Sequence, residues 1–211
     1  MRVEGSMPRI LIASTNAGKL REIRSLFSNI PVKLIGLDQL PPDSAFVEEG
    51  ETFAEVAGAK ALHYHLLHKL PAVADDSGLV VDALDGEPGV RSSRYLGEDT
   101  PFAEKMSSIL ARLEGIPPEK RTARFTCAVA VAIHGRVVST IVKHVFGRII
   151  DELRGSGGFG YDPIFYCPKL KVTFAEAAAE DKNRVSHRGQ AFRALSYLFE
   201  THDPIRTSLG L

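Results

Sequence analysis

The stretch VADDSGLVV (residues 73–81) places two carboxylates, a hydroxyl and a glycine between two apolar runs. Residues 72–74 predict a short buried strand that ends at Asp75 and Asp76, and residues 79–84 predict a further apolar segment. Adjacent side chains on a strand point to opposite faces. At a strand end, one aspartate can therefore face a ligand while the other holds the loop. An Asx-type turn that merely closes the strand is the structural alternative.

The apolar pattern on both sides of this stretch predicts alternating strands and helices. Strands are expected at residues 9–14, 32–37 and 164–166, and helices at 18–29, 52–69, 101–114, 174–181 and 187–201. Residues 121–134 and 136–146 predict an antiparallel hairpin around His134 and Gly135. The order favours an α/β fold with a mixed central sheet and flanking helices. We expect residues 1–8 to be a flexible extension and residues 9–211 to form one domain with two lobes.

Composition limits the classes of partner. The chain has 211 residues and zero formal net charge, so it has no overall surplus of positive charge for nucleic acid or an anionic membrane. The two cysteines, Cys127 and Cys167, form no CxxC pair and are expected to be buried in a reducing compartment. No apolar run approaches the roughly 18 residues of a membrane span, and no signal peptide is evident. These features predict a cytoplasmic protein.

Two segments are candidates for binding phosphate and metal. STNAGK (residues 14–19) follows a predicted strand and opens a helix, a geometry that presents backbone N–H groups to an anion. Lys19 is unfavourable at that helix end unless an anion is bound there; a polar turn with a solvated lysine is the alternative. Glu48 precedes another predicted helix, where it is either a solvated charge or a ligand. Carboxylates together with substrate phosphates are how Mg²⁺ is usually held, so the Asp75–Asp76 pair is a candidate for a metal ligand.

Two further segments are candidates for binding a base. GSGGFGYD (residues 155–162) lets a ligand approach the backbone closely, and its aromatic residues offer faces for a base or for the core. DKNRVSHRG (residues 181–189) carries basic donors that could pair with a carbonyl on a base or with phosphate. The structural alternative is a basic loop in which Ser186 or a neighbour caps the last helix. Acids, glycines, aromatic rings and basic donors together are typical of a nucleoside triphosphate site.

Five stretches resemble the inosine triphosphate pyrophosphatase family, also called Ham1-like or dITP/XTP pyrophosphatases. They are ASTNAGKLREI (13–23), TFAEVAGAKA (52–61), ADDSGLVVDALDGEPGVRSSRY (74–95), GSGGFGYDPIF (155–165) and DKNRVSHRGQA (181–191). They occur in the family's order, and the resemblance covers nearly the whole chain from residue 9 to residue 199. Two positions depart from the family: it usually has ETG where this chain has Glu48-Glu49-Gly50, and an amide where this chain has Val56.

The resemblance implies an α/β fold with two lobes around a deep substrate cleft, a homodimer, and a requirement for Mg²⁺. It implies hydrolysis of ITP, dITP and XTP to the monophosphate and pyrophosphate by water attack at the α-phosphorus, which removes deaminated purines from the nucleotide pool. Asp76 would be the proton acceptor and a metal ligand, and Glu48 the other metal carboxylate. The substrate-binding residues that it implies are Ser14, Thr15, Asn16, Ala17, Gly18, Lys19, Lys60, Ser77, Phe159, Gly160, Tyr161, Asp162, Lys182, His187 and Arg188.

Two other functions remain as hypotheses. A related pyrophosphatase for modified pyrimidines would share the metal chemistry but need a different base pocket, against which the retained SHRG and GGFGYD segments argue. A nucleotide-sensing module without catalysis would be expected to lack Asp76 or Glu48, and both are present. The purine enzyme is therefore the favoured prediction.

Overall fold

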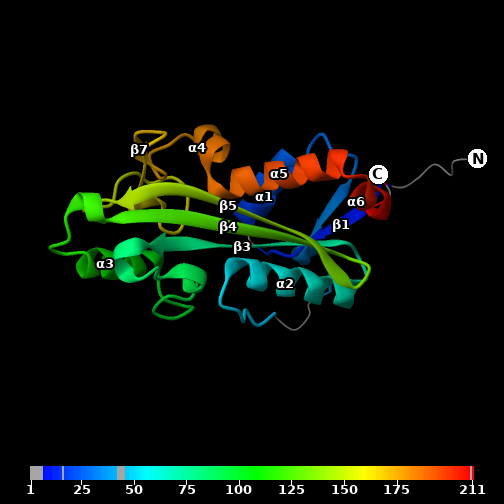
Figure 1. Ribbon diagram of the computed structural model, residues 1–211, viewed down its shortest axis with the longest axis horizontal. Helices are drawn as coiled ribbons and strands as arrows, with labels where there is room; N and C mark the ends of the chain where they lie inside the picture. Colours follow the sequence, from blue (N-terminus) through cyan, green and yellow to red (C-terminus); the bar gives the residue numbers. More distant parts are fainter. Residues whose placement is uncertain (1–6, 16, 42–45, 210) are drawn as a thin grey trace, which may run out of the picture. The chain divides into compact units, whose positions relative to one another are not determined.

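The computed structural model describes residues 7–15, 17–41, 46–209 and 211, so residues 1–6 of the predicted extension lie outside the described residues. The described strands form a seven-stranded sheet in the order β2-β1-β3-β4-β5-β6-β7 (Figure 1). They are β1 (Arg9–Ile12), β2 (Lys33–Gly36), β3 (Ala72–Val81), β4 (Thr122–Ile133), β5 (Arg136–Ile149), β6 (Phe165–Cys167) and β7 (Val172–Thr173). β1 pairs in parallel with β2 and β3, whereas β6 pairs antiparallel with β5 and β7. The predicted mixed α/β sheet is confirmed.

The described helices cover the segments between these strands. They are α1 (Ala17–Leu26), α2 (Phe53–His68), α3 (Phe102–Arg112), α4 (Ala179–Val185), α5 (His187–Thr201) and α6 (Asp203–Leu209). Short 3-10 helices occupy Leu37–Gln39, Asp82–Leu84, Gly89–Arg91, Pro118–Lys120 and Asp162–Ile164. None of the helices in the described ranges combines the length and the apolar character that crossing a membrane would require.

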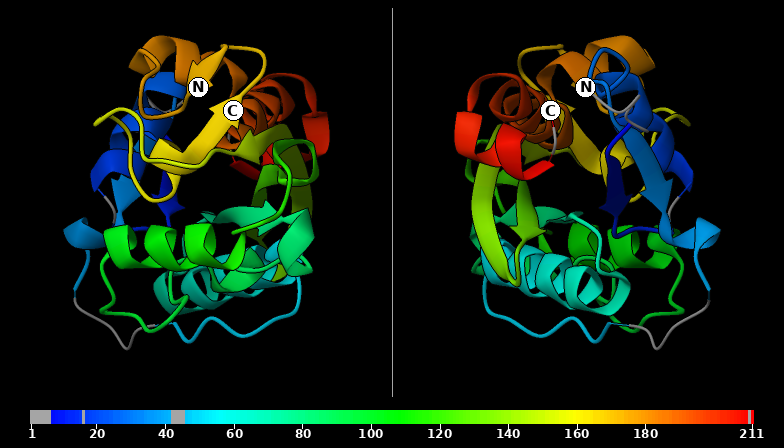
Figure 2. Two further views of the ribbon diagram at one scale, coloured as in Figure 1. Left: turned by 90° about the vertical axis from the view of Figure 1, so that its left-hand side faces the viewer. Right: turned by 90° about the vertical axis from the view of Figure 1, so that its right-hand side faces the viewer.

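The chain divides into two compact units, each with its own core. The first comprises residues 1–76, 128–142 and 191–211, as far as they are described, and the second comprises residues 77–127 and 143–190. The first unit contains the paired strands β1 and β2, blue in Figure 2, and a core rich in alanine from α2, β3 and β4. Small side chains let α2 approach the strands closely. The core of the second unit is built instead from larger residues, including Phe125, Phe165 and Phe174.

Three predicted elements are confirmed closely. Helix α5 has the predicted bounds, and the β4–β5 hairpin turns at His134 and Gly135, whose φ angles are +53° and +74°. Positive φ at both residues is the backbone of a two-residue hairpin turn. Helix α2 begins at a capping box, because Thr52 Oγ1 accepts from the Glu55 N–H at 3.2 Å and Glu55 Oε2 accepts from the Thr52 N–H at 3.1 Å.

Two sequence predictions are wrong. Strand β3 does not end at the acidic pair but continues through it to Val81, since nearly every residue of the strand is buried and the chain needs no turn there. The helix expected at residues 174–181 is displaced and begins only at Ala179. Thr173 and Glu176 exchange hydrogen bonds that stabilise a turn before it: Glu176 Oε2 accepts from the Thr173 N–H at 2.8 Å, and Thr173 Oγ1 from the Glu176 N–H at 3.2 Å. Helix α6 was not predicted.

Candidate functional site

Strand β3 holds the two aspartates inside the first unit. Asp75 and Asp76 are 3% and 8% exposed, so each carboxylate requires compensation from its surroundings. Lys19, in the first turn of α1, donates from Nζ to Asp75 Oδ2 at 2.9 Å. This ion pair holds the lysine at the helix start, where an unpaired cation would be unfavourable. The orientation of the Lys19 ammonium group is therefore fixed by Asp75.

Asp76 lies in the electrostatic field of a second acid–lysine pair. Lys60 on α2 donates to Glu48 Oε1 at 2.5 Å. Burial raises the pKa of Asp76 to about 7; Glu48 and Asp75 add to the rise, while Lys60 and Lys19 oppose it. Burial acts to lower the pKa of Lys60, but Glu48 and the two aspartates outweigh it, so that pKa is raised. The structure thus brings together five acids and lysines from four separate places in the sequence.

The acids of this cluster fit a divalent cation. Oδ2 of Asp76 is buried and has no hydrogen-bond partner among the described residues. Buried polar atoms of this kind usually have a partner, and a cation would supply the missing interaction. The described ranges contain no group of three or more His, Cys, Asp or Glu side chains that could hold a metal. Asp76 and Glu48 could supply two carboxylates, the kind of ligand that a divalent cation shares with substrate oxygens.

The turn that follows Glu48 is shaped by Gly50 and Val56. Gly50 has φ of +148°, which favours glycine, and a Cβ there would lie 2.9 Å from Cγ2 of Val56. Val56 is buried on the first turn of α2, at the position where the family usually has an amide. Packing of the turn against Val56 gives this chain an apolar contact at that position.

The second unit contains a compact cluster around Asp162. Its Oδ2 accepts from Lys182 Nζ at 2.6 Å and from the backbone N–H of Phe159 at 2.8 Å. Burial raises the pKa of Asp162, whereas Lys182 and the Phe159 N–H oppose that rise. Gly158 has φ of +71°, and a Cβ there would lie 2.1 Å from the same carboxylate oxygen. Gly158 is thus required by close packing against the buried ion pair.

Phe159 presents an aromatic ring beside two cations. The residue is 45% exposed, with Lys182 Nζ 5.0 Å and Arg188 Cζ 5.1 Å from its ring centroid. Both distances lie within the range of cation–π attraction. The neighbouring His187 stacks on Phe125, with ring centroids 4.8 Å apart and planes 8° apart. The structure therefore places two of the predicted substrate-binding residues, Lys182 and Arg188, beside a third, Phe159.

Helix α5 begins with a side-chain cap. Ser186 Oγ accepts from the Gly189 N–H at 3.1 Å, so the predicted alternative role of Ser186 is confirmed. This cap fixes the start of the helix that carries His187 and Arg188, both of which are buried. Capping and ligand binding by this segment are compatible, because they use different side chains.

The remaining predicted site residues do not take part in the described contacts of the two clusters. Tyr161 is buried, its hydroxyl donates to Ser92 O at 2.9 Å, and burial raises its pKa above the usual range, so the ring belongs to the core. Ser14 and Ser77 are half-buried, and Thr15 is exposed. Ala17 and Gly18 belong to the first turn of α1. Asn16 lies outside the described residues.

Sequence reasoning missed the contacts of Tyr161. The ring of Phe102, on α3, packs edge to face against the ring of Tyr161. The Nζ of Lys105, on the same helix, lies over the Phe102 ring. One signal could have revealed Lys105, which falls on the apolar face of its helix with Met106 and Ile109. A charged residue at such a position is seldom fully buried without partners that require it.

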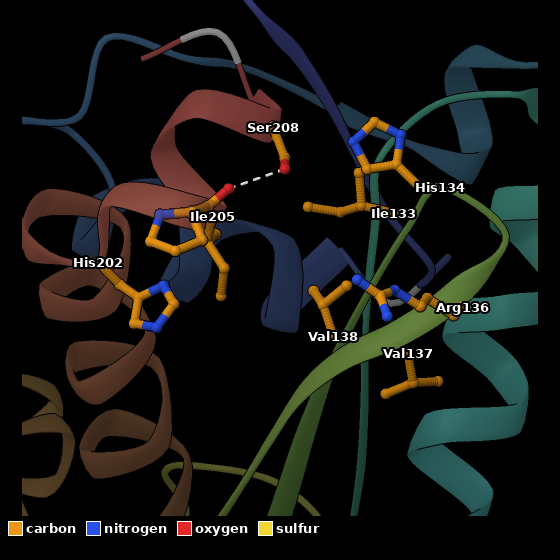
Figure 3. Close-up of a pocket in the computed structure, with 9 residues that line it drawn as sticks. Ile133, His134, Arg136, Val137, Val138, His202, Ile205 and Ser208 are labelled. Atoms are coloured by element: carbon orange, nitrogen blue, oxygen red, sulfur yellow. Dashed lines mark hydrogen bonds between the residues drawn. The ribbon is translucent and has the colours of Figure 1, made fainter.

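The first unit also has a surface pocket of about 280 Å³ (Figure 3). The close-up shows Ser208 donating to the carbonyl of Pro204, at 2.7 Å. His134, Arg136 and His202 are exposed. The pocket therefore offers no buried charged group that would select a ligand. Its lining residues, none of them a predicted site residue, are Ile133, His134, Arg136, Val137, Val138, His202, Pro204, Ile205 and Ser208.

Fold and clusters together define an α/β protein with one acid–lysine cluster and one aromatic–basic cluster. The model of the Ham1 family matches residues 10–198. The chain is 48% identical over 194 residues to a dITP/XTP pyrophosphatase of Geobacillus kaustophilus, covering 92% of this chain and 95% of that protein. It is 45% identical to one of Geobacter sulfurreducens, covering 90% and 95%.

A solved structure agrees with these sequence comparisons. A HAM1 protein from Coxiella burnetii aligns with a TM-score of 0.84 at 41% identity, covering 92% of this chain and 99% of that chain. The chain belongs to the Ham1 family. The resemblance inferred from its five motifs is confirmed.

Proposed function

We propose that this protein hydrolyses dITP, ITP and XTP to the nucleoside monophosphate and pyrophosphate, and so removes deaminated purines from the nucleotide pool. The names of its relatives support this activity. The observation that carries it is Asp76, a buried carboxylate beside Glu48 with one oxygen that has no hydrogen-bond partner among the described residues. A nucleoside triphosphate supplies the two kinds of group that the clusters suit, a polyphosphate with its cation and a base.

The acid–lysine cluster would perform the chemistry. Glu48 and Asp76 would hold Mg²⁺, which when bound neutralises phosphate charge and lowers the pKa of a coordinated water. Asp76 would accept the proton of the water that attacks the α-phosphorus. Lys19 and Lys60 would neutralise the charge that develops on the departing pyrophosphate. Asp75 would keep Lys19 oriented, because the two already form an ion pair.

The aromatic–basic cluster would select the base. The ring of Phe159 offers a face for stacking, and Lys182 and Arg188 add positive charge beside it. Donors from His187 and Arg188 would suit the 6-keto oxygen of hypoxanthine or xanthine. Adenine carries an amino donor at that position and would leave buried donors unpaired, which costs on the order of 1–3 kcal/mol for each group.

The test is a product assay. The purified protein with Mg²⁺ is given ITP, XTP, GTP, ATP and a pyrimidine triphosphate, and pyrophosphate and monophosphate are measured separately. Asp76→Asn is expected to lower pyrophosphate release by about 10² or more. Asp82→Asn, at an exposed carboxylate paired with Arg124, is the matched control and should keep full activity. Release of single phosphate, or equal rates for ITP and ATP, would refute the assignment.

We further propose that the protein is a cytoplasmic homodimer, as the family resemblance implies. Light scattering coupled to size-exclusion chromatography tests the assembly. A mass near twice the 23.0 kDa of the chain is expected. A mass of one chain over the working concentration range would refute it.

A further inference from the structure

Lys105 is the most completely buried charged side chain among those described. The residue is 1% exposed, and its Nζ donates to the backbone carbonyl of Ser93 at 2.5 Å. The same Nζ lies 5.0 Å from the ring centroid of Phe102, one turn earlier on α3. A carbonyl and an aromatic face stabilise an ammonium group without neutralising it. Burial of a lysine in these surroundings is costly, so its position calls for an explanation.

Contacts of Phe102 connect this lysine to the segment that carries Phe159. The rings of Phe102 and Tyr161 pack edge to face, with centroids 5.3 Å apart and planes at 87°. A Cβ placed on Gly160 would lie 3.6 Å from the Phe102 ring, so the ring also lies near this backbone. Phe102 is 38% exposed. Its ring contacts Lys105 on the same helix and lies against Gly160 and Tyr161, two consecutive residues of the glycine-rich segment.

The backbone carbonyls of Ser92 and Ser93 accept hydrogen bonds from Tyr161 and Lys105, respectively. Tyr161 donates its hydroxyl proton to Ser92 O at 2.9 Å, and Lys105 donates to the next carbonyl. The Ser92 hydroxyl is itself fixed: it donates to Gly89 O at 2.6 Å and accepts from the Leu79 N–H at 2.9 Å. The Ser92–Ser93 backbone thus anchors both the lysine and the tyrosine. All of these groups belong to the second unit.

We propose that Phe102 and Lys105, the α3 pair, are positioning residues that set base affinity by fixing Gly160 and Tyr161 beneath Phe159. This inference rests on the proposed function, which assigns the glycine-rich segment to base binding. Neither residue needs to touch the substrate. Lys105 orients the Phe102 ring and the Ser92–Ser93 backbone; the ring packs against Tyr161, and the Ser92 carbonyl accepts its hydroxyl proton. Loosening the pair would move the segment that carries Phe159 and leave the acids and lysines of the first unit chemically unchanged.

The experiment measures base and phosphate binding separately. Calorimetry gives the affinities for IMP, which carries the base, and for tripolyphosphate with Mg²⁺, which lacks it. Phe102→Leu is expected to weaken IMP binding about 2–10-fold, the range set by loss of one aromatic contact. Lys105→Met, which leaves Ser93 O without its donor, is expected to weaken it about 5–30-fold. Tripolyphosphate affinity should change less than about twofold in both, and KM for ITP should rise while kcat is kept.

Two controls separate positioning from general stability. Phe102→Tyr retains the ring and should bind IMP as the wild type does. Ile109→Ala removes a fully buried side chain from the same helix and should lower thermal stability with little effect on IMP affinity. Unchanged IMP affinity in Phe102→Leu and Lys105→Met would overturn the inference. It would also be overturned if the affinities for IMP and for tripolyphosphate fell equally, in proportion to the loss of stability. A wild-type protein that neither binds IMP nor cleaves ITP would overturn the proposed function, and this inference with it.

Discussion

Replacing Lys182 by methionine is expected to be among the most destabilising single changes in the second unit. The side chains of Lys182 and Asp162 are 9% and 4% exposed, and their ion pair measures 2.6 Å. Removing one partner of a buried pair typically costs about 3–5 kcal/mol, because the other charge remains buried. Asp162 keeps the Phe159 N–H, which favours the lower end of that range. About 3 kcal/mol in a chain of this size corresponds to a fall in Tm of roughly 6–12 °C.

Urea denaturation followed by circular dichroism measures this loss. Asp162→Asn should cost less than Lys182→Met, because the lysine would keep its contacts with the rings of Phe159 and Phe174. The double variant should recover about 1–3 kcal/mol relative to the sum of the single changes, the coupling expected of residues in direct contact.

An exposed ion pair on the same helix provides the control. Arg184 and Asp181 on α4 are paired at 2.8 Å, but both side chains are more than half exposed. Arg184→Met should therefore change stability by less than about 1 kcal/mol. The reasoning fails if Lys182→Met is as stable as Arg184→Met, or if the double variant is no more stable than additivity predicts.

Three further predictions concern single contacts. Gly158→Ala forces a Cβ toward the Asp162 carboxylate at a positive φ and should lower stability by about 1–3 kcal/mol in the same urea assay; wild-type stability would contradict the close packing. His65 Nε2 accepts from the Gly135 N–H at 2.9 Å, so His65→Ala should speed hydrogen exchange at that amide, and unaltered exchange would count against the contact. Burial, and secondarily Arg124, lowers the pKa of His144. The stability that this residue contributes is therefore complete above its unfolded pKa of about 6.5 and is lost as the pH falls toward its folded pKa. His144→Asn should flatten the dependence of unfolding free energy on pH below about pH 6.5, and an unchanged slope would disprove this link.

Elements governed by local chemistry could be predicted from the sequence. The α2 capping box, the β4–β5 turn and the bounds of α5 all depend on residues within a few positions of one another. Strand β3 was predicted too short because polar residues usually interrupt a strand. In this protein Asp75 and Asp76 remain inside it, since Lys19 and Lys60 compensate their charge from other elements.

The candidate site shows the same division. The family motifs supplied the candidate residues, but the pairing of Lys19 with Asp75, 56 positions away, depends on tertiary structure. The resemblance did not indicate that Tyr161 would be a core residue. Phe102 and Lys105, on α3, belong to none of the family motifs. The positioning role proposed for them follows only from their contacts in the structure.

The burial of Lys105 also makes it a chemical reporter. An amine-reactive reagent can label exposed lysines such as Lys120 and Lys171 at once, whereas Lys105 becomes reachable only when α3 leaves its place. The ratio of its labelling to theirs, followed by mass spectrometry, would measure how often this part of the second unit opens. This natural probe requires no engineered residue, and a bound nucleotide that stabilises the Tyr161 segment should slow its labelling.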